Sequence, residues 1–266
     1  MRRAVLMCAG EYEPIPIPVG RDNKSLRSAE AFADEPADEP FVVSVDGGLP
    51  RLLDADIVPD LVLGDFDSLD KKYHPYLEEF GSRHPDRLLR LPCEKDDTDT
   101  VYAARVCLER GCRELLFYGA LGGRLDHTFA NIQTLAWLKK EGADGYLIGK
   151  TTLAAVVGAE RVILPARYEG TFSIFALDEE VGGVTLEGMK YPLSEAVITN
   201  RFPIGVSNEI HPETTANVPG GCACVTVRSG LALIILETET TRTGEVAGGM
   251  KGWGIPDPSE IIRMPL

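Results

Sequence analysis

The first half of the chain alternates short apolar runs with segments of helical periodicity. The apolar runs are rich in leucine and β-branched residues and are bounded by Gly, Asp or Pro, as buried strands typically are. These predicted strands lie at residues 4–9, 41–45, 61–63, 88–91, 115–118 and 146–148. Residues 98–110 and 127–141 place apolar side chains at helical spacing, and a glycine follows each segment. This alternation predicts an α/β domain, a mostly parallel sheet with flanking helices.

The pattern changes near residue 151. Beyond this point short strand-like runs follow one another with Gly or Pro between them, and no segment has convincing helical periodicity. The runs lie at residues 153–157, 161–164, 171–175, 184–186, 223–227 and 231–236. Such a series is typical of an all-β sandwich. We therefore predict two domains, an α/β domain at residues 1–151 and a β-sandwich domain at residues 152–266.

Two segments fit neither pattern. Residues 11–40 hold several prolines and the tandem repeat Ala-Asp-Glu-Pro at 33–36 and 37–40, and residues 30–40 carry acids without a base. This composition predicts an exposed loop. Residues 248–266 include Trp253 and three prolines and indicate no element.

Composition narrows the class of protein. No apolar run approaches the roughly 18 residues of a membrane span, and the apolar N-terminal stretch is interpreted as a strand because no cleavage-like segment follows it. The net charge of −14 argues against nucleic acid or an anionic membrane as the main partner. Six scattered cysteines, of which only Cys222 and Cys224 are close, indicate reduced thiols in the cytoplasm.

Polar motifs follow four successive predicted strands of the first domain. They are Asp46-Gly47-Gly48, Gly64-Asp65-Phe66-Asp67-Ser68, Lys95-Asp96-Asp97-Thr98-Asp99 and Gly122-Gly123-Arg124-Leu125-Asp126-His127. Ligands of open parallel sheets bind beyond the carboxyl ends of the strands. The four motifs therefore predict one shared site.

The residue types in these motifs suit metal and phosphate chemistry. Asp65 and Asp67 are paired carboxylates of the kind that bind Mg²⁺, which bridges to substrate phosphates. Asp96 or Asp97 is expected to cap the next helix, which leaves Asp99 to join the metal cluster. Arg124 offers a planar cation for phosphate oxygens. For His127, a polar position in a first helical turn and a nucleotide contact are equally good interpretations.

Together with Ser207-Asn208-Glu209, these four motifs occur in the order found in thiamine pyrophosphokinases, and they resemble that family. The segment Gly188-Met189-Lys190-Tyr191-Pro192-Leu193 is similar to the family's second domain. The resemblance runs from about residue 41 to about residue 236. It implies an α/β ATP-binding domain, a β-sandwich domain that binds thiamine and forms a homodimer, and transfer of pyrophosphate from ATP to thiamine with release of AMP.

The resemblance also implies roles for individual residues. Asp65, Asp67 and Asp99 are expected to hold Mg²⁺ and, with Arg124, to form the catalytic set. Ser207 and Asn208 are expected to approach thiamine. The nucleotide and its phosphates are expected to contact Asp46, Gly47, Asp96, Arg124, Asp126 and His127.

Mg²⁺ explains how an acidic protein binds a polyanionic nucleotide, because the metal reverses the sign of the site. Two alternatives stay open from the sequence. Asp65-Phe66-Asp67 after an apolar strand also suits a haloacid-dehalogenase-like phosphatase, in which the first aspartate is a covalent nucleophile. The other alternative is a non-catalytic module that senses a nucleotide or a thiamine compound.

Overall fold

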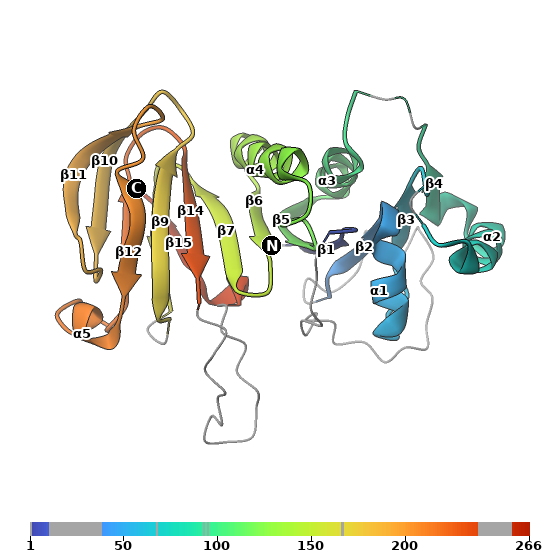
Figure 1. Ribbon diagram of the computed structural model, residues 1–266, viewed down its shortest axis with the longest axis horizontal. Helices are drawn as coiled ribbons and strands as arrows, with labels where there is room; N and C mark the ends of the chain where they lie inside the picture. Colours follow the sequence, from blue (N-terminus) through green and yellow to red (C-terminus); the bar gives the residue numbers. More distant parts are fainter. Residues whose placement is uncertain are drawn as a thin grey trace, which may run out of the picture. The chain divides into compact units, whose positions relative to one another are not determined.

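The computed structural model describes residues 2–10, 39–67, 69–92, 94, 96–165, 168–238 and 257–266. The predicted loop at residues 11–38, Trp253 of the C-terminal segment, and the motif residues Ser68 and Lys95 lie outside the described residues. The chain divides into two compact units, Met1–Gly149 and Lys150–Leu266. Figure 1 shows that helices belong mainly to the first unit and strands dominate the second.

The first unit is built on a six-stranded parallel sheet. Its spatial order is β6-β5-β1-β2-β3-β4, and every neighbouring pair in it is parallel. The strands are β1 (Arg2–Met7), β2 (Phe41–Val45), β3 (Leu61–Gly64), β4 (Leu88–Arg90), β5 (Cys112–Tyr118) and β6 (Asp144–Ile148). Every residue of β2 and β3 is buried, because helices cover the sheet and leave these strands no solvent face. This confirms the predicted α/β fold.

The helices pack on both faces of this sheet. They are α1 (Leu49–Asp54), α2 (His74–Arg83), α3 (Asp99–Glu109) and α4 (Leu125–Lys140). The chain runs outward from β1 in one direction through β4 and then returns to β5 and β6 on the other side. Right-handed crossovers in opposite directions place α3 and α4 on one face and α1 on the other, as Figure 1 shows. The sequence predicted α3 and α4, whereas α1 and α2 carry weaker patterns.

A buried ion pair ties three strands together. The Asp60 carboxylate accepts from the backbone N–H of Val42 at 2.8 Å and from the Arg87 guanidinium at 3.2 Å. Arg87 also donates to the backbone carbonyl of Asp60 at 2.7 Å. Asp60 and Arg87 are 1% and 2% exposed, so water does not solvate either charge. Each charge is stabilised by the other and by these hydrogen bonds. The pair fixes the loop before β3 against β2 and the turn before β4.

The second unit consists of two antiparallel sheets, ordered β12-β9-β14-β7 and β11-β10-β13-β8-β15. This confirms the predicted all-β architecture. The strands are β7 (Thr152–Val157), β8 (Glu160–Ile163), β9 (Gly170–Ala176), β10 (Glu180–Glu187), β11 (Leu193–Thr199), β12 (Gly205–Ile210), β13 (Cys224–Val227), β14 (Ala232–Glu237) and β15 (Ile262–Pro265). A short helix, α5 (Pro212–Thr215), follows β12.

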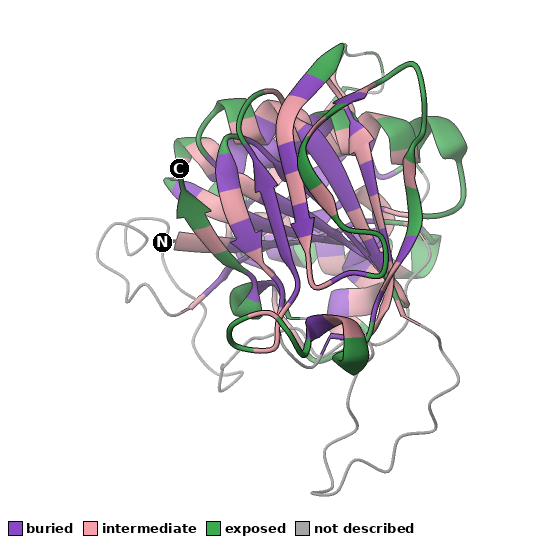
Figure 2. Cartoon of the chain, turned by 90° about the vertical axis from the view of Figure 1, so that its left-hand side faces the viewer, coloured by how far each residue is buried: buried purple, intermediate pink, exposed green. Residues whose placement is uncertain are grey.

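Three of these strands, β11, β12 and β15, are not among the predicted ones. Each lies at the edge of a sheet, where exposed side chains interrupt the hydrophobic pattern. Figure 2 shows the contrast, with buried strand interiors and exposed residues gathered in loops and at the margins.

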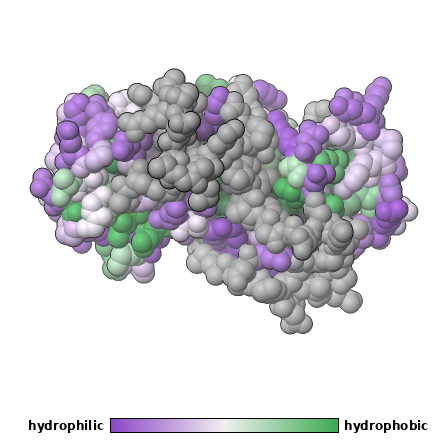
Figure 3. All heavy atoms as spheres, turned by 90° about the horizontal axis from the view of Figure 1, so that it is seen from below, coloured by the Kyte–Doolittle hydropathy of each residue, from purple (hydrophilic) through white to green (hydrophobic). Residues whose placement is uncertain are grey.

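No helix in the described part of the chain is long and apolar enough to cross a membrane. Among the residues that carry colour in Figure 3, hydrophilic ones are widespread and hydrophobic ones gather at a few places, one of them on the left over the second unit.

Candidate active site

Three aspartates of the first unit converge beyond the carboxyl ends of its strands. Asp46 directly follows β2, Asp65 directly follows β3, and Asp99 opens α3. One carboxylate oxygen from each lies within 4.8 Å of the others, and all three side chains are half-buried. The structure thus brings together three of the acids that the sequence assigned to one site.

Close backbone packing creates this convergence. Gly64, the last residue of β3, has φ 147°, and a Cβ atom there would lie 2.8 Å from the Cα of Asp46. Only glycine therefore lets the end of β3 pass so near to Asp46. Asp46 itself has φ 48°, a left-handed conformation that is uncommon for a residue with a side chain. Strain at Asp46 and the missing side chain at Gly64 together set the distance between two of the three acids.

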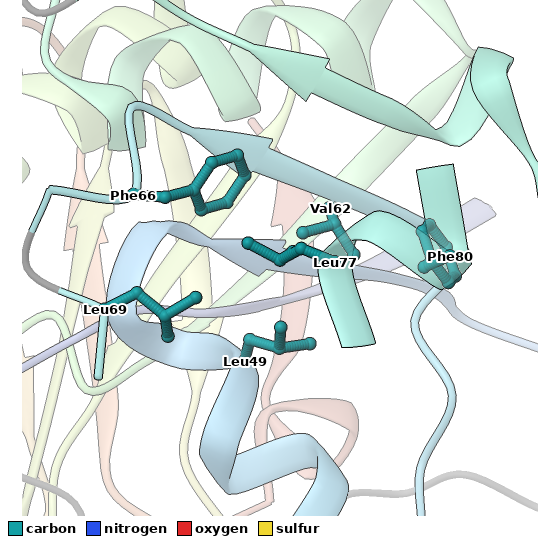
Figure 4. Packing of buried hydrophobic residues seen from close by; sticks show 6 residues of the cluster. All are labelled: Leu49, Val62, Phe66, Leu69, Leu77 and Phe80. Carbon is teal, nitrogen blue, oxygen red and sulfur yellow. The ribbon is translucent and has the colours of Figure 1, made fainter. Parts of the chain in front are cut away.

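Phe66 explains how the Asp65-Phe66-Asp67 loop is oriented. Its side chain is 5% exposed and packs into a core cluster. Figure 4 shows this cluster, in which the Phe66 ring enters from the loop that follows β3 and lies among Leu49, Val62, Leu69, Leu77 and Phe80. The apolar residue between the two aspartates thus anchors the loop while its polar neighbours stay at the surface of the core. The guanidinium carbon of Arg90 lies over the Phe66 ring, 5.6 Å from its centroid.

The loop before α3 differs from the prediction in one respect. Thr98, not Asp96 or Asp97, is the N-cap, and its hydroxyl accepts from the backbone N–H of Val101 at 3.2 Å. Asp97 instead pairs with Arg105 at 2.7 Å, about two turns into the helix. Asp96 is exposed. The helix begins at Asp99, so the N-cap position falls on Thr98, and the Asp99 carboxylate in the first helical turn joins the cluster.

Asp67 is placed differently from Asp65. It is exposed, its backbone N–H donates to the Asp65 carboxylate at 3.2 Å, and its carboxylate is not one of the three that converge. Asp46 occupies the third position in the cluster, whereas the sequence suggested a nucleotide contact for it. The assignment of Asp67 as a metal ligand stays a prediction.

The loop between β5 and α4 presents its charged residues to solvent. Gly122 and Gly123 adopt φ 81° and 65°, which carries the chain outward. The Arg124 guanidinium then donates two bonds to the Asp126 carboxylate, at 3.2 and 2.6 Å. This bidentate bond lowers the pKa of Asp126 and raises that of Arg124. The backbone N–H of His127 also donates to Asp126, at 3.0 Å.

Arg51 is a residue of this region that sequence reasoning missed. From α1 it donates to the backbone carbonyls of Cys8, Ala9 and Gly10 at the end of β1. The backbone N–H of Gly10 donates in turn to the carbonyl of Gly119 at 2.8 Å. Arg51 therefore brings positive charge to the end of the sheet where the acids converge and fixes the chain there. Nothing in the local pattern around Arg51 marks it, because its partners are backbone atoms distant in sequence.

The donor set of the three acids fits a divalent cation. Three carboxylates within 4.8 Å repel one another in a half-buried setting, and a hard cation offsets that repulsion. Carboxylate oxygens are the ligands that Mg²⁺ prefers. Gly47, which follows Asp46, is half-buried in the short 3₁₀ turn Asp46–Gly48.

In the second unit, Asn208 is turned inward and Ser207 outward. The Asn208 amide accepts from the backbone N–H groups of Tyr191 and Glu209, both at 2.9 Å, and donates to the Tyr191 carbonyl at 2.8 Å. Ser207 is exposed with φ 59°, and its N–H donates to the Ser173 hydroxyl at 3.1 Å. The Tyr191 side chain is 59% exposed, with the Lys190 ammonium 5.5 Å from its ring centroid. The sequence analysis recognised the Lys190-Tyr191-Pro192 motif but gave no role to the Tyr191 ring.

Two family models match this chain in succession. Residues 32–147 match "Thiamin pyrophosphokinase, catalytic domain", and residues 161–222 match "Thiamin pyrophosphokinase, vitamin B1 binding domain". The first match spans the three converging aspartates and Arg124. The second spans Tyr191, Ser207 and Asn208.

Individual relatives agree with this match. The chain is 32% identical to a thiamine pyrophosphokinase of Bacillus subtilis over 181 residues, which are 67% of this chain and 83% of the relative. A solved structure of thiamine pyrophosphokinase from Bacillus subtilis has a TM-score of 0.69 at 24% identity and covers 90% of this chain and 100% of its own. A thiamin pyrophosphokinase structure from Geobacillus thermodenitrificans has a TM-score of 0.65 at 26% identity and covers 91% and 99%. The chain belongs to the thiamin pyrophosphokinase family.

Proposed function

We propose that this chain transfers pyrophosphate from ATP to the hydroxyl of thiamine and releases AMP. The predicted enzyme, a thiamine pyrophosphokinase, is confirmed by the family membership. One structural observation carries the proposed chemistry. Asp46, Asp65 and Asp99 converge within the region that matches the catalytic domain.

Mg²⁺ is the metal that we propose for this cluster, with Asp46, Asp65 and Asp99 as its protein ligands. When bound, the metal supplies positive charge that neutralises phosphate oxygens and the leaving AMP. When no metal is bound, three half-buried carboxylates lie close together and repel one another. A bound cation offsets this repulsion, which makes cation binding favourable. Their rigid backbone, set by Gly64 and the Phe66 anchor, keeps the ligand oxygens in place.

Arg124 is proposed to bind phosphate oxygens of ATP. Its pairing with Asp126 holds the guanidinium group in one orientation at the N-terminus of α4. The lowered pKa of Asp126 keeps that acid ionised. A phosphate can replace Asp126 as the acceptor because both offer two oxygens at similar spacing. His127, Asp96 and Gly47 are proposed to contact the rest of the nucleotide.

Asp67 is the acid that we propose for the thiamine hydroxyl. The attacking hydroxyl must be oriented and must lose its proton, and a carboxylate outside the metal ligands serves both purposes. Asp67 lies two residues from Asp65 in the same loop but outside the converging trio. The resemblance placed Asp67 and Asp99 alike among the metal ligands, and this proposal gives the metal to Asp99 and the thiamine hydroxyl to Asp67.

Ser207, Asn208 and Tyr191 are proposed to form the thiamine-binding surface. Thiamine carries two aromatic rings and a positive charge, so an aromatic side chain with an exposed face suits it. Tyr191 offers such a face, and Asn208 fixes its backbone through two hydrogen bonds. In this proposal Ser207 contacts thiamine directly, and Asn208 acts by holding Tyr191 in position.

A homodimer and a cytoplasmic location are further proposals. Exposed apolar side chains between and along β11 and β12, namely Val197, Phe202, Ile204 and Val206, support a surface that a second copy covers. Sedimentation of the purified chain would detect the dimer. The thiols of Cys8, Cys107, Cys112, Cys222 and Cys224 are compatible with a reducing compartment.

The test is AMP release from Mg·ATP with and without thiamine, followed by mass analysis of the products. We expect AMP and thiamine diphosphate only when thiamine is present. Release of ADP or free phosphate would instead favour the phosphatase-like alternative, in which Asp65 becomes phosphorylated. Binding of thiamine without turnover would favour the sensor alternative.

A further inference from the structure

Two cysteines lie together at the start of β13 in the second unit. The Sγ atoms of Cys222 and Cys224 are 4.0 Å apart. Cys224 is buried as the first residue of β13, whereas Cys222 is half-buried in the loop before it. The Cys222 thiol is therefore reachable from solvent, whereas the Cys224 thiol is buried.

A cation accompanies the inner thiol. Arg161 of the neighbouring strand β8 pairs with Glu187 of β10 at 2.9 Å, and these strands flank β13 on its two sides. Burial raises the pKa of the Cys224 thiol, and a hydrogen bond from Arg161 opposes that increase. Arg161 thus stabilises negative charge on the Cys224 sulfur during an exchange reaction.

The chain before the pair has room to rearrange. Gly220 and Gly221 have φ 84° and 63°, and a Cβ at Gly221 would meet no atom within 4 Å. A disulfide needs the two sulfur atoms about 2 Å apart, so Cys222 must approach Cys224 by a similar distance. A two-glycine turn absorbs such a shift at little cost.

That shift reaches the Lys190–Tyr191 segment through a close backbone contact. A Cβ at Gly188 would lie 2.7 Å from the carbonyl oxygen of Cys222, so these two backbones already touch. Gly188 opens the segment whose amides are held by Asn208 and Glu209: Tyr191 N–H donates to the Asn208 side chain and Lys190 N–H to the Glu209 carbonyl, both at 2.9 Å. Movement of Cys222 therefore displaces a segment that is held by specific bonds.

We propose that Cys222 and Cys224 form a reversible disulfide that loosens the Gly188–Tyr191 segment. The oxidant is a low-molecular-weight disulfide such as oxidised glutathione. The Cys222 thiolate attacks one of its sulfur atoms and releases the first glutathione thiolate. The Cys224 thiolate then attacks the Cys222 sulfur of the mixed disulfide and releases the second, so two thiols lose two protons and two electrons while the oxidant's bond is reduced.

The first measurement is peptide mapping by mass spectrometry of the folded chain after treatment with oxidised glutathione. We expect the peptide that holds Cys222 and Cys224 to lose two hydrogens and to regain them with dithiothreitol. Cys107 and Cys112 are both 0% exposed and provide an internal control that should stay reduced. Oxidation of that pair in preference to Cys222–Cys224, or a stable mixed disulfide at Cys222 alone, overturns the proposal.

The second measurement is hydrogen exchange of the Lys190 and Tyr191 amides in the reduced and oxidised chain. We expect oxidation to speed their exchange by about 2- to 30-fold, the size of effect that single substitutions have within coupled networks of residues. Cys222→Ser should match the reduced chain under both conditions, which also shows that it folds. Unchanged exchange in a fully oxidised chain overturns the coupling. Any effect on thiamine rests on the proposed function, whereas these two measurements do not, so the two can fail separately.

Discussion

The side-chain amide of Asn208 holds the backbone of Tyr191 from both sides. Its oxygen accepts from the Tyr191 N–H at 2.9 Å, and its nitrogen donates to the Tyr191 carbonyl at 2.8 Å. Asn208 is 5% exposed, whereas Tyr191 is 59% exposed. A buried amide on β12 thus fixes the place of an exposed ring 17 residues earlier in the chain.

Replacing Asn208 should weaken thiamine use more than ATP use. Asn208→Ala removes both bonds to Tyr191 and leaves partly buried backbone groups unsatisfied, at a cost of about 1–3 kcal/mol in the free energy of unfolding. We expect KM for thiamine to rise about tenfold and KM for ATP to stay unchanged. Tyr191→Ala should give a similar rise, and the double variant should be no worse than either, because both act through one ring. Additive losses would show that Asn208 contacts thiamine independently.

Replacing any one of the three converging aspartates should lower activity without lowering stability. Asp46→Asn, Asp65→Asn or Asp99→Asn should each lower kcat by about 10²-fold or more. Each should also reduce the rise in melting temperature that Mg²⁺ produces, while melting without metal stays equal or improves because repulsion falls. Asp56→Asn, an exposed acid after α1, is the matched control and should change neither quantity.

Asp67→Asn separates metal binding from proton transfer. If Asp67 orients the thiamine hydroxyl, this variant should lose turnover by about 10²-fold or more and yet keep the full melting shift with Mg²⁺. Calorimetric titration with Mg²⁺ gives an independent check. A loss of metal binding equal to that of Asp65→Asn would place Asp67 among the ligands, as the sequence suggested.

Gly64 should tolerate no side chain. In Gly64→Ala the new Cβ would lie 2.8 Å from the Cα of Asp46, at a backbone conformation of φ 147°. We expect a loss of about 2–5 kcal/mol in the free energy of unfolding, together with weaker Mg²⁺ binding. Gly142→Ala is the control, because Gly142 has φ 73° but no atom within 4 Å of a Cβ. It should cost only about 1 kcal/mol and leave metal binding intact, both measurable by urea unfolding and titration.

The buried Asp60–Arg87 pair should matter to folding and not directly to catalysis. Asp60→Asn leaves the Arg87 charge uncompensated at 2% exposure and should cost about 3–5 kcal/mol in urea unfolding. Glu78→Gln breaks the exposed pair with Arg90 and should cost less than about 1 kcal/mol. Equal losses in the two variants would contradict the role given to burial.

Thiol reactivity should differ sharply between Cys8 and Cys222. Burial raises the pKa of Cys8 to about 12, so at pH 8 only about one thiol in 10⁴ there is ionised. Its alkylation by iodoacetamide should stay slow as pH rises from 7 to 9, whereas Cys222 should be alkylated faster because solvent reaches its side chain. Rapid alkylation of Cys8 in the folded chain would contradict the pKa shift. Mass mapping after timed quenching measures both sites.

Much of the fold was predictable because the signals are local. The strands of the parallel sheet are continuous apolar runs, and α3 and α4 have clear periodicity and a following glycine. Edge strands such as β11 and β12 were not predictable, because their sequences mix polar and apolar residues where one side of the strand faces solvent. The helix cap is Thr98 and not an aspartate, because the helix begins at Asp99, and adjacent polar residues that all suit a cap do not show where a helix begins.

The sequence by itself determined the family, the two fold classes and the end of the sheet at which the acidic motifs gather, because each depends on residue types and their order. Only the tertiary structure decided that Asp46 joins Asp65 and Asp99 while Asp67 does not, and that Asn208 turns inward to hold Tyr191. These outcomes depend on the close packing of β3 against Asp46 at Gly64 and on the hydrogen bonds of a buried amide. Distances of this kind are set by contacts between segments far apart in the chain, which a linear pattern does not encode.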